Sequence, residues 1–294
     1  RSMSFYDLIN NFSNTYINEI HGIAEGANIA FEDAMLCQIR FGKLDNTNDE
    51  GCTAFSFKEK STLNSNLYTG QNQDMDPEFL NFGFVLKLIP SIDIPQIIMF
   101  TFPGQIGYAG MNEHGISNFA NALYNYQTQK GVPHYILKRK LLEQRSLETC
   151  KKILNTINVS EAANVLISDK NNIIDFEFHN KSRYEFTSHD QNSIIHTNHY
   201  LTDELIKFED NTLIDSPIRL QRMHNLIKNI YGNINLDNIK NILGDHCNFP
   251  SSICRHGANN MDTVSGYIAD PSNKTFHIRK GFGCDMNWQS YIFD

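Results

Sequence analysis

The spacing of apolar residues changes along the chain from a helical period to a strand-like one. Apolar side chains at 5, 8, 9, 12, 16, 20 and 23 recur every three or four residues, which predicts an amphipathic helix. A second helix is expected over 30–40, because Glu32 and Asp33 would lie in its first turn, where the helix dipole favours acidic groups. Beyond residue 52, short aromatic and β-branched runs between turns predict strands.

The strand-like runs form blocks that are separated by pairs of predicted helices. The runs cover 53–58, 66–71, 82–90, 96–102, 106–111 and 115–120, then 163–168, 173–178, 182–187 and 192–197, with 263–269 and 274–279 closing the chain. Helices are predicted at 132–145, 147–157, 216–231 and 236–243. The third begins at Ser216-Pro217, with serine as N-cap and proline as first residue. This order indicates stacked antiparallel sheets with helices outside, not alternating βαβ units.

Composition narrows the class of partner. The chain has 294 residues, 40% hydrophobic and 20% charged, with 20 Phe and 12 Tyr to build a core. Its net charge is −8 and it has no basic block, which argues against nucleic acid or a membrane as partner. No apolar run approaches the ~18 residues of a spanning helix, and no leader precedes the first helix. We therefore expect a small-molecule partner.

The six cysteines are scattered and form no CxxC motif, which argues against a zinc ribbon. Free thiols in a reducing compartment fit this scatter better than a disulfide framework, so we expect a cytoplasmic protein. His196 and His199 lie close in sequence, but no carboxylate cluster completes a metal site beside them. We expect no metal site.

Gly51-Cys52 is the strongest candidate for chemistry. It follows an acidic, Asn-rich loop and precedes a strand-like run. A cysteine that becomes a chain terminus by self-cleavage combines a thiol with its own α-amine as base. The reference pKa of that amine is about 7.7–8.0, so the pair is poised near neutral pH. The alternative is a structural cysteine, half-buried at the start of a strand.

Three further polar segments are candidates. Asn72 and Asp74, two apart at a strand end, share one face and could orient an amine and a thiol, or they form an Asx-rich turn. Asn198 follows a buried strand, where its amide could donate to an oxyanion, or it belongs to a surface turn. Arg255 could hold a carboxylate or tune the thiol; the alternative is a surface ion pair.

Together these segments resemble one family, the acyl-coenzyme A:isopenicillin N (6-aminopenicillanic acid) acyltransferases, which are related to the choloylglycine hydrolases. Several strings match the family's motifs, and they occur in the family's order over most of the chain. They are Glu19 to Ala27, Gly51-Cys52-Thr53, Gly70 to Asp74, Asn112-x-x-Gly115, Asn121-Ala122-Leu123, Gly131-Val132-Pro133, His196 to His199, Asp215-Ser216 with Arg219 and Arg222, and Ser252 to Arg255.

The resemblance implies the four-layer αββα fold of N-terminal-nucleophile hydrolases, an α+β fold. It implies autoproteolysis between Gly51 and Cys52 into a short chain, 1–51, and a long chain, 52–294, which together form one domain. It also implies the roles of the catalytic residues. Cys52 would be nucleophile and base, Asp74 would position the α-amine, Asn198 would donate to the oxyanion, Arg255 would lie beside the thiol, and Asn121 would be a second oxyanion donor.

Departures from the family pattern bear on specificity. Gln73 replaces the family's Trp, and Gln71 stands where choloylglycine hydrolases carry an arginine, which puts bile-salt substrates in doubt. The resemblance places the segment after Asp74 near the acyl group. Met75 and Phe79 of that segment are therefore predicted substrate-binding residues, as is Asn72 of the motif that ends at Asp74, and we expect an apolar acyl group.

The predicted function is an amidase or acyltransferase that cleaves or transfers an acyl group, from an amide or a thioester, through an acyl-cysteine. No cofactor is expected, and acyl-coenzyme A stays open as a co-substrate. One alternative is a non-catalytic or unprocessed family member that acts as a binding module. Another is a papain-like enzyme, which would need its cysteine to open a helix, whereas Cys52 opens a predicted strand.

Overall fold

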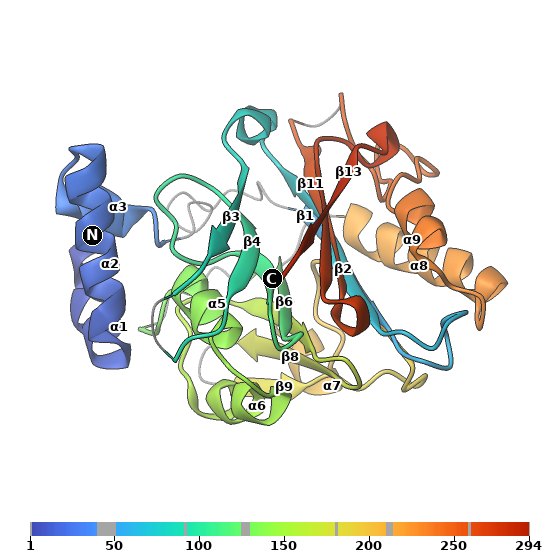
Figure 1. The fold of residues 1–294 in the computed structure, drawn as a ribbon. Helices are drawn as coiled ribbons and strands as arrows, with labels where there is room; N and C mark the ends of the chain where they lie inside the picture. The colour runs from blue at the N-terminus through green and yellow to red at the C-terminus, as the bar shows by residue number, and fades with distance from the viewer. Residues whose placement is uncertain are drawn as a thin grey trace.

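The computed structural model describes residues 2–39, 51–90, 93–124, 130–179, 182–209, 214–257 and 260–293. In this part of the chain two antiparallel sheets stack on one another, and helices lie outside both (Figure 1). The arrangement confirms the predicted α+β class and the αββα layer order. None of the described helices is long and apolar enough to cross a membrane. The acidic loop before Gly51 lies outside the described residues.

The first sheet carries the predicted cleavage junction, and its strand order is β10-β1-β2-β11-β12-β13. In that order the strands are β10 (Ser193–His196), β1 (Gly51–Phe57), β2 (Tyr68–Met75), β11 (Asp262–Asp270), β12 (Thr275–Lys280) and β13 (Trp288–Ile292). Because β1 and β2 are inner strands, their side chains are buried along their whole length. The junction thus lies inside the sheet and not at its edge.

The second sheet runs in simple chain order, β3-β4-β5-β6-β7-β8-β9. Its strands are β3 (Phe84–Leu88), β4 (Ile97–Thr101), β5 (Ala109–Asn112), β6 (Ser117–Ala122), β7 (Ala163–Ser168), β8 (Ile173–His179) and β9 (Ser182–Glu185). The turn between β5 and β6 forms a hairpin, and Gly115 adopts a φ of 82° there, which favours glycine.

Three groups of buried apolar side chains hold the layers together. Aromatic residues, among them Phe100, Phe119 and Tyr267, fill the space between the sheets. Phe55 and Phe57 point the other way, against α8 (Asp215–Ile230) and α9 (Leu236–Ile242). The outer face of the second sheet packs on α5 (His134–Leu142) and α6 (Leu147–Thr156). Burying each such side chain contributes about 1.5–3 kcal/mol.

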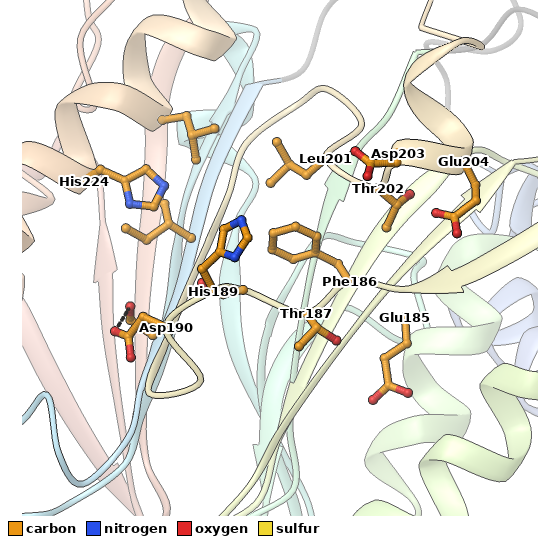
Figure 2. A pocket seen from close by; sticks show the side chains of 14 residues that line it. Glu185, Phe186, Thr187, His189, Asp190, Leu201, Thr202, Asp203, Glu204 and His224 are labelled. Carbon is orange, nitrogen blue, oxygen red and sulfur yellow. Dashed lines mark hydrogen bonds between the residues drawn. The ribbon is translucent and has the colours of Figure 1, made fainter.

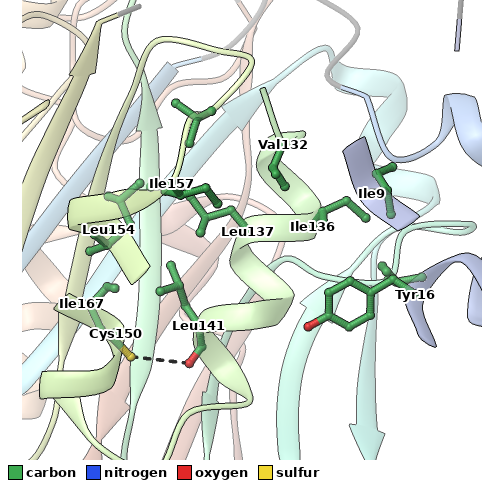
Figure 3. Close-up of a cluster of buried hydrophobic side chains, with 14 of the residues drawn as sticks. Ile9, Tyr16, Val132, Ile136, Leu137, Leu141, Cys150, Leu154, Ile157 and Ile167 are labelled. Atoms are coloured by element: carbon green, nitrogen blue, oxygen red, sulfur yellow. Dashed lines mark hydrogen bonds between the residues drawn. The ribbon is translucent and has the colours of Figure 1, made fainter. Parts of the chain in front are cut away.

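The helices that precede the junction pack against α5. They are η1 (Ser2–Phe5), α1 (Tyr6–Phe12), α2 (Asn14–Ala27) and α3 (Phe31–Leu36). Figure 3 shows Ile9 and Tyr16 beside Ile136 of α5, in one buried cluster. The Tyr16 hydroxyl donates to Glu143 at 2.6 Å. The N-terminal segment is therefore attached to the rest by buried contacts.

The structure corrects the sequence analysis at three places. The chain closes with β13, which was not predicted, because this edge strand is partly exposed and lacks a clear apolar alternation. Short elements were also missed: η2 (Pro77–Asn81), α7 (Asp203–Ile206), η3 (Pro271–Asn273) and η4 (Gly283–Asp285). Ser216 is not an N-cap, because α8 begins one residue earlier and the Ser216 hydroxyl instead accepts from the Asn198 nitrogen at 2.8 Å.

Candidate functional site

Gly51 and Cys52 open β1, where they pair with Asp74 and Gln73 of β2. A Cβ atom at position 51 would lie 1.9 Å from Nη2 of Arg255 and 3.1 Å from Oδ2 of Asp74. A larger residue at this position would push the Arg255 guanidinium away from Asp74, so the close packing around the junction favours Gly51. The Cys52 side chain is fully buried, and the residue lies at the start of strand β1. The papain-like alternative requires a cysteine at the start of a helix, so the structure does not match it.

Asp74 and Arg255 form a buried ion pair beside Gly51. Nη2 of Arg255 lies 2.8 Å from Oδ2 of Asp74. The hydroxyl of Thr263 donates to the other carboxylate oxygen at 2.6 Å, and the Arg255 backbone nitrogen donates to that hydroxyl at 2.9 Å. The surface ion pair considered for Arg255 is therefore wrong, because Asp74 is fully buried and Arg255 is only 6% exposed.

Arg219 of α8 is a residue of this cluster that the sequence analysis did not select. Its guanidinium is fully buried and donates to the carbonyl oxygen of Cys52. It also donates to Asp215 and to Oδ1 of Asn198, at 2.8 Å in each case. The sequence feature that could have identified Arg219 is its position in the segment from Asp215 onward, which resembles a family motif.

Asn198 lies directly against the backbone of Cys52. Its Oδ1 accepts from the Cys52 nitrogen at 2.8 Å and from Arg219, while its Nδ2 donates to the carbonyl of Ala122 at 3.1 Å. Because two donors point at one end of the amide, the orientation of the side chain is defined by its hydrogen bonds. The oxygen of Asn198 therefore faces the atom that cleavage would turn into the α-amine.

Opposite charges alternate through the cluster. Arg255 donates to Asp215 at 2.9 Å as well as to Asp74, and Asp215 also pairs with Arg219. Burial acts to raise the pKa of Asp215, but the charges of Arg219 and Arg255 outweigh it and lower that pKa. Burial acts to lower the pKa of Arg255, but Asp74 and Asp215 raise it. Two carboxylates thus balance two guanidinium groups.

Side chains of β2 and β11 lie beside the Cys52 side chain, on the same face of the first sheet. Cys52 and Ser265 are both opposite Gln73 in the register, so their side chains share the face that meets the second sheet. Tyr267 lies further along β11, and its hydroxyl shares a hydrogen bond with Ser265. Burial, and to a smaller extent a charge on Cys52, raises the pKa of Tyr267. Tyr267 is therefore a further neighbour of the thiol that the sequence analysis did not select.

Two other predicted amide side chains join separate parts of the fold. Asn121 is fully buried, accepts from Gln71 at 2.8 Å and donates to the carbonyl of His196 at 2.9 Å, so it bridges the two sheets. Asn72 is also buried, and its amide donates to carbonyls of Leu243 and Ile253 on the helical side of the sheet. Their predicted roles in catalysis and substrate binding stay predictions.

The predicted acyl-pocket residues lie in or beside the aromatic core between the sheets. Met75 ends β2 and is 4% exposed, with the Tyr108 hydroxyl 3.8 Å from its sulfur. Phe79 of η2 is partly buried and meets Phe102 edge-to-face, with ring centroids 5.3 Å apart. Tyr267 belongs to the same buried cluster as Met75, and Phe79 packs against that cluster.

His196 and His199 occupy different hydrogen-bond networks. His196 is fully buried, and its Nε2 lies 2.7 Å from Glu177 of β8. Burial acts to lower the pKa of His196, but Asp175 and Glu177 raise it. His199 bonds the hydroxyl of Ser216 at 2.8 Å. The carboxylate partner of His196 comes from a distant strand, which is why the sequence did not reveal it.

One cavity of about 650 Å³ lies beside β10 and α8. Figure 2 shows Phe186, His189 and His224 around its centre. None of the predicted site residues lines it. This cavity is therefore distinct from the Cys52 cluster, which is the candidate site because it joins buried charges, amide groups and a thiol.

Comparisons with known proteins agree with this architecture. The solved structures that match include an ortholog of N-acylethanolamine-hydrolyzing acid amidase from Caenorhabditis elegans, with 15% identity and a TM-score of 0.53 over 75% of this chain and 93% of that one. Penicillin V acylase from Agrobacterium tumefaciens matches with 11% identity and a TM-score of 0.56 over 78% and 83%.

A mutant of conjugated bile acid hydrolase from Clostridium perfringens matches with 12% identity and a TM-score of 0.53 over 83% of this chain and 97% of that one. At these identities the likeness concerns the fold alone, and it confirms the predicted N-terminal-nucleophile hydrolase fold. A search of the curated proteins by sequence finds no match.

The family model described as acyl-coenzyme A:6-aminopenicillanic acid acyl-transferase matches residues 60–281. The matched region holds Asp74, Asn198 and Arg255, and it begins after the Gly51–Cys52 junction. It spans more than half of the sequence. The chain therefore belongs to the acyl-coenzyme A:6-aminopenicillanic acid acyl-transferase family.

Proposed function

We propose that the protein is a self-processing amidohydrolase or acyltransferase whose nucleophile is Cys52. One observation carries the proposal: the backbone nitrogen of Cys52 donates to Asn198, and its carbonyl accepts from Arg219. A buried ion pair of Asp74 and Arg255 lies against the preceding glycine. Family membership supports acyl transfer, and the names of the similar structures, an amidase, a hydrolase and an acylase, support amide substrates.

Maturation would proceed by an acyl shift at the junction. The Cys52 sulfur attacks the carbonyl carbon of Gly51 and gives up its proton, and the Cys52 nitrogen leaves and becomes an amine. Water then hydrolyses the thioester, which leaves a carboxylate on Gly51 and a free thiol and α-amine on Cys52. Asp74 could orient the reacting groups in this step, because its Oδ2 would lie 3.1 Å from a Cβ atom at position 51.

Turnover would use the same atoms a second time. The α-amine takes the thiol proton, and the thiolate attacks the substrate carbonyl to form an acyl-cysteine, while the leaving amine takes a proton. Water or an acceptor amine then releases the acyl group. Asn198 would hold the α-amine through Oδ1, and its amide N–H group is the proposed oxyanion donor. Arg219 and Arg255 would stabilise the negative charge that develops.

The proposed substrate is a small amide or thioester with an apolar acyl group, and acyl-coenzyme A is one possible acyl donor. Met75 and Phe79 lie on the aromatic cluster that contains Tyr267, so an acyl chain on Cys52 would meet apolar surface. Each methylene buried there should add about 0.8 kcal/mol, until the space is filled. We expect kcat/KM to rise with acyl chain length and then level off.

A series of N-acyl amides and acyl thioesters of increasing chain length tests this proposal. Trapping followed by peptide mass analysis should find the acyl group on Cys52. Phe79→Ala should shorten the preferred chain, while Phe249→Ala, a change at an exposed aromatic residue outside the apolar cluster, should leave the preference unchanged. A kcat/KM that does not change with acyl chain length, or a preference for charged acyl groups, would contradict the apolar pocket. Neither result would bear on the role of Cys52 as nucleophile.

Absence of turnover on every substrate, in protein that nevertheless binds them, would favour the alternative of a binding module. An acyl adduct on a different cysteine would overturn the assignment of the nucleophile. The cysteines other than Cys52 in this chain are Cys37, Cys150, Cys247, Cys254 and Cys284. Cys247 and Cys254 fall in one tryptic peptide, so fragmentation of that peptide is needed to tell these two apart.

A further inference from the structure

Two histidines and two cysteines meet beside the segment that carries Arg255. His246 lies shortly after α9, Cys254 and His256 flank Arg255 in the chain, and Cys284 lies in η4. Each offers one ligand atom, and the four atoms all lie within 4.8 Å of one another. Three separate parts of the chain are thus brought to one point.

The spacing of these atoms suits a tetrahedral ion. Zinc binds cysteine sulfur at about 2.3 Å and histidine nitrogen at about 2.0–2.1 Å, so the edges of such a tetrahedron measure about 3.3–3.8 Å. The Cys284 sulfur lies 3.5 Å from Nε2 of His256, which is within that range. The widest separation would need to close by only about 1 Å to reach it.

Neighbouring groups support a bound thiolate and an ordered imidazole. The backbone nitrogen of Gly283 points at the Cys254 sulfur, 3.1 Å away, in the manner of the outer hydrogen bonds that orient metal ligands. The His256 ring stacks on Phe282 with centroids 4.4 Å apart. A Cβ at position 283 would lie 2.0 Å from the carbonyl oxygen of Leu243, so glycine lets the two ligand-bearing segments approach.

We propose that His246, Cys254, His256 and Cys284 bind one Zn²⁺ ion as a structural site. Two thiolates and two neutral imidazoles give this ion an electrically neutral complex, in which Cys254 is buried, His256 is half-buried, and His246 and Cys284 are exposed. From the sequence, the scattered cysteines without a CxxC motif argue against a zinc ribbon, and no metal site is expected. The four proposed ligands come from three parts of the chain that the fold brings together. Cys254 and His256 are close in sequence, with one residue between them, and the other ligands lie further away.

The ion would fix the segment on both sides of Arg255. The Arg255 backbone also pairs with Thr263, through its nitrogen at 2.9 Å and its carbonyl at 2.7 Å. Zinc would therefore add a third restraint to the residue that holds Asp74. Metal binding itself does not depend on the proposed function; only its effect on processing and turnover does.

The test measures metal in untagged, full-length protein that was purified under reducing conditions without chelators. We expect about one zinc ion per chain by elemental analysis. Protein that has been stripped and loaded with Co²⁺ should show the strong visible absorption of a tetrahedral cobalt–thiolate centre. Cys284→Ser and His246→Asn, which change two exposed residues, should each lose most of the zinc and the cobalt absorption, and should lower the Tm.

Cys247→Ser is the matched control, since Cys247 is an exposed cysteine next to His246 and is not one of the four ligands. This variant should keep the wild-type metal content. Wild-type protein that takes up neither Zn²⁺ nor Co²⁺ after reduction would overturn the proposal. So would a Cys254–Cys284 disulfide in the intact mass, or a Cys284→Ser variant that binds zinc like the wild type.

Discussion

Cys52 is held through both of its backbone polar groups, its nitrogen by Asn198 and its carbonyl by Arg219. A residue that is to become a chain terminus needs such restraints, because cleavage removes the peptide bond that fixed its nitrogen. The Asn198 oxygen is a suitable acceptor for a protonated or neutral amine. The amide N–H of the same side chain is the proposed oxyanion donor. The oxygen of Asn198 would thus hold the α-amine, and its nitrogen would stabilise the oxyanion.

Two substitutions at Asn198 separate these tasks. Asn198→Ala should lower kcat by about 10²–10³-fold with a modest change in KM, because the lost donor acts mainly in the transition state. Asn198→Asp keeps an acceptor for the Cys52 nitrogen and for Arg219 but removes the donor. It should therefore lose a similar factor in kcat while still undergoing cleavage. Steady-state kinetics and gel analysis of both variants check this.

A rise in KM alone for Asn198→Ala would mean that the residue binds substrate. Full activity of Asn198→Asp would mean that only the acceptor matters, and the oxyanion donor would have to be sought elsewhere.

Sequence reasoning selected Cys52, Asp74, Asn198 and Arg255, and the structure brings these four together around one strand end. It did not select Arg219. An arginine on an amphipathic helix is usually solvated, and nothing in the local pattern shows that this one is buried against the carbonyl of Cys52. Its partners lie far from it in the sequence, except for Asp215 at the i,i+4 position.

At the scale of elements, the register of β1, β2 and β11 positions the site. Gly51, Asp74 and Thr263 lie in one row across these strands, and Cys52, Gln73 and Ser265 lie in the next. Most strands were predictable because their apolar and β-branched runs are clear. The pairing order was not, since β10 joins β1 across a long stretch of chain. The partly exposed edge strand β13 lacked the apolar pattern that prediction needs.

The buried position of His277 on β12 should make stability depend on pH. His277 lies opposite Ser290, and burial together with the charge of Lys240 lowers the pKa of His277 to about 4. Unfolded histidine titrates near 6.5, so between about pH 6.5 and 4 the unfolded state binds a proton that the folded state does not. The free energy of unfolding contributed by this site therefore falls as the pH falls through that window.

Urea unfolding of wild type and His277→Gln at several pH values measures this effect. The stability of wild type relative to the variant should decline on acidification, by at most about 1.4 kcal/mol per pH unit. A constant difference between the two proteins from pH 7 to pH 4 would contradict the assigned shift.

At the scale of the whole molecule, the segment before the junction should stay bound after cleavage. Ile9, Ile17 and Ile20 are buried against the helical layer, and Arg139 of α5 forms an ion pair with Glu19 at 2.8 Å. The two chains should therefore copurify as the single domain that we predicted.

Ile20→Ala should weaken this attachment by about 2–5 kcal/mol, as expected for a buried aliphatic side chain. Asn18→Ala, an exposed change on the same helix, should have little effect. Size-exclusion chromatography of cleaved protein, with mass analysis of each fraction, distinguishes retained from released short chain. Release of the short chain from the wild type would show that the helical layer does not hold it.

Intact-mass analysis of purified wild type and Cys52→Ala tests the central claim most directly. Cleavage before Cys52 predicts two chains for the wild type, 1–51 and 52–294, with a cysteine at the new N-terminus. It predicts one chain of 33.7 kDa for Cys52→Ala, because that variant lacks the sulfur that attacks Gly51. A wild-type chain that stays intact through long incubation while it turns over substrate would contradict the account.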